Sequence, residues 1–215
     1  MKTRIAPLRL GIERQLRVIG LLDGADEVGL TPLATLELHT LAYLSDALAP
    51  VWGLPLVDAQ ILKGRRPYFP SLQRDIDQLV GLGVIAVAGA TYIQAGAQWQ
   101  VDARFSLHRE YADPILNAVR QYENRTRELE FVREVVFAAS ALGREGIADA
   151  TSVDAAYGDP VVGEGGVIDL ADEQGNATAD VARRFAALTG QETSVSPAAM
   201  LHLYVRHLFM RLERE

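Results

Sequence analysis

The sequence has no cysteine among its 215 residues, which excludes a disulfide, a thiol nucleophile and a cysteine-ligated metal site. It also has no uncharged apolar run long enough to cross a bilayer. Charges are scattered through residues 1–22, so this stretch lacks the continuous apolar centre of a secretory signal. We therefore expect a cytoplasmic protein that does not contact a membrane.

Catalytic and cofactor motifs are missing as well. The chain has no G-x-S-x-G, no kinase motif set and no zinc-protease helix. The glycine-rich segment 161–170, VVGEGGVIDL, is not followed by Gly-Lys-Ser/Thr and is therefore no phosphate-binding loop. We expect a protein that is not an enzyme and holds no cofactor, although catalytic carboxylates can meet from distant positions.

Neither the histidines nor the acidic residues have metal-ligand spacing. His202 and His207 lack the i, i+4 separation that places two ligands on one helix face. His39 lies in a leucine-rich segment and is expected to be a core histidine with satisfied hydrogen bonds. An acidic patch near the C-terminus lacks the spacing of a calcium loop. Its members are Asp159, Glu164, Asp169, Asp172 and Glu173.

Basic charge is scarce in one particular stretch. The chain carries a formal net charge of −7 and has a pI of about 5.2, which opposes unspecific binding to nucleic acid or anionic membranes. From Asp75 to Ala103 there is no lysine or arginine, although Asp77 and Asp102 lie within this stretch. Any DNA contact is therefore expected to be weak or indirect.

The same stretch belongs to the most clearly patterned part of the chain, residues 63–107. A helix begins at Pro70, which suits the first helical position because proline lacks an N–H, and Gly81 and Gly83 end it. Two strands follow at 84–93 and 99–107, joined by a hairpin loop over 94–98. The apolar face of the helix repeats with helical periodicity and consists of Leu72, Ile76, Leu79 and Val80.

Two further helices are predicted before this unit. Residues 33–48 form a leucine-rich helix that starts at Thr31-Pro32, and residues 56–62 form a short one. Three helices followed by a hairpin are typical of a winged helix. We expect a mainly α fold with a small β-hairpin wing (α+β), in which a winged helix-like core is flanked by N-terminal and C-terminal helices.

The chain is predicted to divide into a winged helix-like domain with an N-terminal helix, residues 1–110, and a helical C-terminal region with a short glycine-rich loop and strand, residues 111–215. In the first part, 1–10 should be extended and 12–22 helical. In the second, the predicted elements are a helix from Asp113-Pro114 to Leu142, helices over 148–157, 176–188 and 197–215, and a strand over 167–170.

A basic turn precedes the Pro70 helix, and two interpretations of it remain open. Lys63, Arg65, Arg66 and Arg74 could contact DNA or another anionic partner, because basic side chains supply most of the affinity for phosphate. Alternatively, the turn is a solvated surface whose arginines pair with nearby aspartates, which is the interpretation we favour.

The segment 61–85, ILKGRRPYFPSLQRDIDQLVGLGVI, resembles the winged-helix segment of the middle components of bacterial ABC-three-component systems, and is similar to the small subunit of Lamassu-type antiphage operons. Residues 155–160 and 167–170, with Asn176, also fit this group. The resemblance implies a non-enzymatic adaptor in an antiviral defence complex. Such an adaptor docks on an SMC-like or Rad50-like coiled-coil ATPase and holds an effector in check.

A winged-helix transcription regulator is the rival hypothesis. It would need a basic surface and a homo-oligomer, which the helices over 114–142 or 197–214 could form. The neutral to acidic wing argues against it, because a DNA-binding wing contacts the phosphate backbone. An enzyme that uses unlinked acidic residues ranks last.

Overall fold

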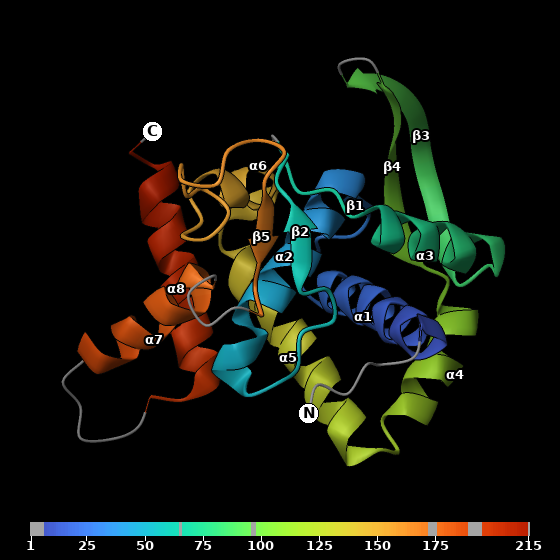
Figure 1. Ribbon diagram of the computed structural model, residues 1–215. Coiled ribbons are helices and arrows are strands. Elements are labelled where there is room, and N and C mark those ends of the chain that lie inside the picture. The colour runs from blue at the N-terminus through green and yellow to red at the C-terminus, as the bar shows by residue number, and fades with distance from the viewer. Residues whose placement is uncertain (1–6, 65, 96–97, 172–175, 189–194, 215) are drawn as a thin grey trace.

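The computed structural model describes residues 7–64, 66–95, 98–171, 176–188 and 195–214 (Figure 1). The fold is mainly helical with two small antiparallel sheets, and therefore of the α+β class expected from the sequence. Among these described residues, no helix has both the length and the apolar character that crossing a bilayer requires. The helices are α1 (Pro7–Glu27), α2 (Thr35–Trp52), α3 (Pro70–Gly81), α4 (Arg109–Val119), α5 (Glu123–Ser140), α6 (Gly143–Asp149), α7 (Ala177–Leu188) and α8 (Pro197–Leu212), with a 3₁₀ turn at Ala150–Ser152.

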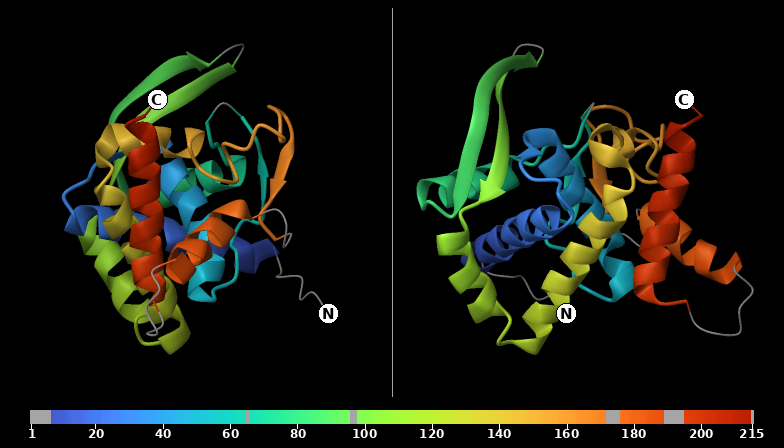
Figure 2. Two further views of the ribbon diagram at one scale, coloured as in Figure 1. Left: turned by 90° about the vertical axis from the view of Figure 1, so that its left-hand side faces the viewer. Right: turned by 180° about the vertical axis from the view of Figure 1, so that it is seen from behind.

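Two sheets hold five described strands. The larger sheet has the order β1-β4-β3, with β1 (Leu33–Ala34), β3 (Ile85–Ala95) and β4 (Gln98–Leu107) all antiparallel to their neighbours. The smaller sheet pairs β2 (Gln60–Leu62) with β5 (Val167–Asp169). Figures 1 and 2 show the β3–β4 hairpin projecting well beyond the helices.

Helix α2 forms the centre of the core. All of its residues from Glu37 to Ala49 are buried, and α1, α5, α7 and α8 pack around it. One hydrophobic core therefore includes residues from both of the regions that we separated near residue 110. Examples are Leu44 of α2, Ile76 of α3, Val136 of α5 and Leu208 of α8.

Helix α1 is longer than predicted at both ends. Residues 1–6 lie outside the described part, but Pro7 starts the helix instead of blocking it, and the helix continues through Asp23-Gly24 to Glu27. The reason is tertiary. A Cβ atom at residue 24 would lie 3.2 Å from the Cα of Arg133 in α5, so glycine at this position lets the two helices approach closely. The sequence alone shows this glycine only as a helix breaker.

The start and end of α2 were also predicted incorrectly. The Thr31-Pro32 peptide is cis, residues 33–34 form strand β1, and the helix begins at Thr35, where Glu37 accepts a hydrogen bond from the backbone N–H of Ala34 (2.6 Å). The helix includes Pro50 and ends before Gly53, whose φ of 71° is left-handed. Pairing of β1 with β4, which is distant in sequence, explains the later start.

The predicted helix over 56–62 is wrong. The segment is extended, and the backbone N–H groups of Val57 and Asp58 donate to the Oδ1 atom of Asp46 (2.9 and 3.2 Å). Residues 60–62 then pair with β5. Both contacts are with partners outside the segment, and they outweigh its local helical pattern.

In the C-terminal half, the predicted long helix over 114–142 is in fact α4 and α5. Helix α4 starts at Arg109, which forms ion pairs with α1, and it includes Pro114. The helices separate at residues 120–122, where the Thr126 hydroxyl donates to the Arg120 carbonyl (3.1 Å). The helix predicted over 148–157 is wrong too, since α6 ends at Asp149 and only a 3₁₀ turn follows.

Several predicted elements are confirmed. Helix α3, strands β3 and β4, and strand β5 lie close to their expected positions, although residues 96–97 of the hairpin loop lie outside the described part. Asn176 caps α7, because its Oδ1 accepts from the N–H of Ala179 (3.1 Å). Ser196 caps α8 through a hydrogen bond from the N–H of Ala199 (3.2 Å). These elements begin or end at signals that are local in sequence.

Candidate functional site

The β3–β4 hairpin, which we call the hairpin arm, presents an apolar and nearly uncharged surface. Strand β3 contains no charged residue, and Asp102 and Arg104 are the charged residues of β4. Val87 and Tyr92 of β3 are 42% and 76% exposed. Large exposed apolar side chains on a projecting element indicate a surface that contacts another macromolecule.

The hairpin arm also has unpaired strand edges. Strand β3 is at the edge of its sheet, and β1 covers β4 only at Arg104 and Phe105. Beyond them the Thr35 hydroxyl bonds both the N–H and the C=O of Ala103 (3.1 and 3.2 Å). Edges are commonly protected by lysine, proline or a bulge. Here the register shift between Ala88 and Thr91 is the one such device within the described part of β3.

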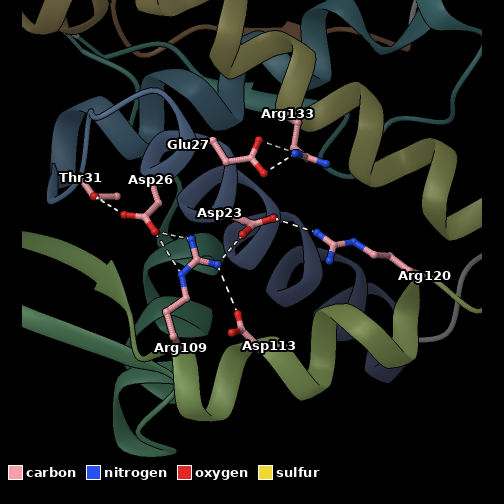
Figure 3. A network of polar contacts seen from close by, with 8 residues as sticks. All are labelled: Asp23, Asp26, Glu27, Thr31, Arg109, Asp113, Arg120 and Arg133. Carbon is pink, nitrogen blue, oxygen red and sulfur yellow. Dashed lines mark hydrogen bonds and ion pairs between the residues drawn. The ribbon is translucent and has the colours of Figure 1, made fainter.

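An ionic network fixes the base of the hairpin arm to α1 (Figure 3). Arg109, two residues after β4, pairs with Asp23 at 2.6 Å and with Asp26. Arg120 also reaches Asp23 (3.3 Å). The acidic residues occupy the last turns of α1, where the helix dipole disfavours negative charge, so the arginines offset that repulsion. Hydrogen bonds from Arg109, and then from Thr31, lower the pKa of Asp26.

The network of Figure 3 pairs several arginines with carboxylates, and these arginines are therefore not free to bind DNA phosphates. Arg133 of α5 binds Glu27, and Arg109 and Arg120 face Asp23. Other arginines are engaged in the same way, such as Arg125 with Glu13 and Glu128. Within the part of the chain that the structure describes, nine arginines form such ion pairs with carboxylates.

The three described residues of the basic turn do not form one group. Lys63 donates to the backbone carbonyl of Asp159 (2.6 Å), and Arg66 makes an exposed pair with Asp149 (3.4 Å). Arg74 lies exposed on α3 and has no hydrogen bond or ion pair with any residue that the structure describes. Arg65 lies outside the described residues.

A buried ionic cluster lies beneath α1, and no local pattern in the sequence predicts it. Arg17, 5% exposed, binds Asp46 of α2 and also Asp58 (2.7 Å). Arg14 binds Asp75 of α3 and reaches Asp58 at 3.5 Å. Asp75, the acidic residue that opens the stretch without lysine or arginine, is buried in this cluster and adds no charge to the surface near the wing. Burial raises the pKa of Asp46 despite the opposing effect of Arg17.

A second buried polar cluster surrounds the Asp154 carboxylate. The side chain is 1% exposed and accepts hydrogen bonds from the hydroxyls of Tyr43, Tyr204 (2.6 Å) and Thr178 (2.9 Å). Burial, followed by the charge of Asp154, raises the pKa of Tyr43. The backbone N–H groups of residues 156 and 157 also donate to the Oδ1 atom of Asp154. Its inaccessibility makes this cluster structural, joining α2, α7 and α8.

The histidine prediction is confirmed for His39. The residue is 1% exposed, its Nδ1 accepts from the N–H of Phe69 (3.2 Å), and its Nε2 lies 3.2 Å from the Oε1 of Gln73. Burial lowers the pKa of His39 to about 4. The neutral ring therefore donates from Nε2 and accepts at Nδ1.

The acidic patch does not form a cation site in the part of the chain that is described. No group of three or more potential ligands occurs among those residues. The carboxylates of Asp159 and Asp169 accept from the backbone N–H groups of Val161 (2.8 Å) and Ala171 (2.9 Å). Asp172 and Glu173 lie outside the described residues.

Comparison with known proteins identifies no relative. No protein-family model matches the chain, and no curated protein or solved structure gives a significant match.

Proposed function

We propose that the chain is a non-enzymatic adaptor subunit built around a winged-helix unit. The support is topological. The helix predicted over 56–62 is absent, but α1, α2 and α3 still supply three helices before the hairpin, and the first strand of the order α1-β1-α2-α3-β3-β4 pairs with its last. Strand β2 is an insertion between α2 and α3 that pairs with the C-terminal half of the chain.

The observation that carries the adaptor proposal is the chemistry of the hairpin arm. A wing that binds DNA neutralises phosphates with lysine and arginine. This arm projects as a wing does but exposes Val87 and Tyr92, and Arg104 is its one basic residue. Such a surface suits an apolar protein partner better than a polyanion.

The proposed partners follow from the resemblance of residues 61–85. They are an SMC-like or Rad50-like coiled-coil ATPase and an effector protein of a bacterial antiphage defence complex. We assign the hairpin arm to the ATPase, because the exposed Val87 and Tyr92 can pack against an apolar patch of a protein partner without burying unpaired charge.

Co-expression with the proteins encoded by the flanking reading frames tests this assignment. A tagged chain should co-purify with a coiled-coil ATPase in a complex of defined mass. The substitution Tyr92→Asp, which places a carboxylate on the hairpin arm, should lower recovery of the ATPase at least tenfold with an unchanged melting temperature. The control is Tyr122→Asp, because Tyr122 is similarly exposed, at 65%, in the α4–α5 connection at the opposite end of the molecule (Figure 1).

The regulator hypothesis predicts a different outcome. A dimer that binds duplex DNA with a steep salt dependence, and that loses this binding on charge reversal of Arg66 and Arg74, would contradict the adaptor proposal. Fluorescence anisotropy over a range of salt concentrations measures this dependence.

A further inference from the structure

The outer edge of strand β3 carries backbone groups with which no described strand pairs. Strand β3 is the last strand in the order β1-β4-β3, and Figures 1 and 2 show it in the projecting hairpin arm. Residues 87–92 of this strand are all exposed. An open edge of this kind is a template for a further β-strand, because another strand offers donors and acceptors at the matching spacing.

The hydrogen bonds of Ala103 show how the backbone of β4 is oriented. Both the N–H and the C=O of Ala103 bond the hydroxyl of Thr35 (3.1 and 3.2 Å), which follows β1 on the side of β4 away from β3. Along an antiparallel strand, the backbone groups of alternate residues point to the same side. Residues 101 and 105 of β4 therefore also point their N–H and C=O groups away from β3.

Val87 and Tyr92 turn their backbone groups to the open edge of β3. They lie opposite Phe105 and Val101 in the β3–β4 ladder, and both residues of such a non-hydrogen-bonded pair point their N–H and C=O groups outward. The same two residues carry the large exposed apolar side chains of β3. The open edge thus combines free hydrogen-bonding groups with apolar side chains.

From this geometry we propose that the open edge of β3 pairs with the same edge of a second copy of the chain, which gives an antiparallel two-fold dimer. Val87 of each copy lies opposite Tyr92 of the other, and the two-fold axis passes between Gly89 and Ala90. The two hairpin arms then form one continuous sheet.

The register shift between Ala88 and Thr91 makes this pairing self-consistent. Residues that face the open edge have odd numbers before the shift, as Val87 does, and even numbers after it, as Tyr92 does. A two-fold axis between two consecutive residues always places an odd-numbered residue opposite an even-numbered one. Each outward-facing residue of one copy therefore meets an outward-facing residue of the other, and the two shifts lie side by side.

The composition of β3 favours a copy of the same strand as the occupant. A two-fold interface places one surface patch against itself, so a charged residue near the axis would approach its own copy, and like charges on opposed strands are destabilising. Strand β3 has no charged residue, although the chain carries a formal net charge of −7. The proposal uses the edge of the hairpin arm, goes beyond the adaptor function and does not depend on it.

The mass of the full-length protein over a range of concentrations tests the dimer. Sedimentation equilibrium should show a reversible rise from 23.5 kDa toward twice that mass. Val87→Pro removes the outward N–H but no bond to β4, because proline is tolerated where the N–H of an edge strand faces solvent, and should weaken dimerisation at least tenfold. Val87→Thr keeps the N–H and the branched shape and should dimerise within threefold of the unaltered chain. Far-ultraviolet circular dichroism confirms that each variant is folded.

Cross-linking tests the register, since the chain has no cysteine of its own. Opposed residues of a hydrogen-bonded pair have Cα atoms about 5.5 Å apart, which is within the roughly 4.4–6.8 Å that a disulfide spans. Mild oxidation of a mixture of the Val87→Cys and Tyr92→Cys variants should give a covalent dimer. Each variant alone should give at least tenfold less of it, because neither residue lies opposite itself.

Three outcomes would overturn the proposal. The first is a chain that stays monomeric at every concentration, or a Val87→Pro variant that dimerises as tightly as Val87→Thr. The second is cross-linking of Val87→Cys alone that is as efficient as in the mixture, which would refute the register. The third is a monomeric chain in which Val87→Pro instead abolishes co-purification of another protein, since the edge would then take a strand from that protein and not from a second copy.

Discussion

Asp154 holds together three helices, and its replacement by asparagine should be the most informative single change in the core. Asparagine has nearly the same shape but carries an NH₂ group in place of one oxygen. In the native protein both carboxylate oxygens accept, with Oδ1 facing Tyr43 and Oδ2 facing the Tyr204 hydroxyl at 2.6 Å. In the variant, at least one hydroxyl or N–H donor must face another donor.

The cost can be worked out from the bonds that change. A buried donor left without an acceptor costs about 1–3 kcal/mol, and hydrogen bonds to a charged group are stronger than neutral ones by about 1 kcal/mol. Two or more of the remaining bonds lose this charge assistance. The free energy of unfolding of Asp154→Asn should therefore fall by about 3–5 kcal/mol, a large part of the stability of a typical domain.

Urea unfolding, followed by tryptophan fluorescence and circular dichroism, measures this change. The matched control is Asp180→Asn, since Asp180 makes an exposed pair with Arg183 (3.2 Å) and such pairs contribute at most about 1 kcal/mol. If Asp154→Asn were as stable as Asp180→Asn, the carboxylate would not be the structural link between α2, α7 and α8.

Two further predictions concern the packing of α1 and α2. The pKa of His39 is about 4 in the folded protein and about 6.5 when unfolded, so the unfolded state binds the proton more readily. The free energy of unfolding should therefore fall by about 3 kcal/mol through this residue as the pH falls from 6.5 to 4. The substitution His39→Gln should flatten that part of a curve of stability against pH. An unchanged curve would contradict the assigned neutral ring. Gly24→Ala should lower the melting temperature, because the added Cβ would lie 3.2 Å from the Arg133 backbone. Gly81→Ala should raise the melting temperature slightly, because its added Cβ would have no atom within 4 Å. The reverse order of the two melting temperatures would refute the close α1–α5 contact.

The elements that the sequence predicted correctly are those with local signals. Helix α3 combines proline at its start with an apolar face of helical period, and α7 and α8 begin at side-chain caps. The hairpin arm was predictable from its β-rich runs and intervening glycine, and its lack of basic residues is a property of the sequence itself. Each of these features depends on residues within a few positions of one another.

The candidate sites were much less predictable. The basic turn was visible, but the separate positions of Lys63, Arg66 and Arg74 were not. Nothing local indicates that Arg17 meets Asp46, because each residue occurs in a helix that could equally expose it. The unpartnered Nε of the buried Arg17 likewise results from the way these helices pack.

The sequence by itself therefore determined the helical class, the hairpin and its neutral charge, since local periodicity, caps and composition govern them. The tertiary structure alone decided where α1 ends, that residues 60–62 form a strand with 167–169, and which charges are buried. Partners distant in the chain control these features. Their contact energies outweigh local preferences of a fraction of a kcal/mol to about 1 kcal/mol per residue, and local patterns do not record them.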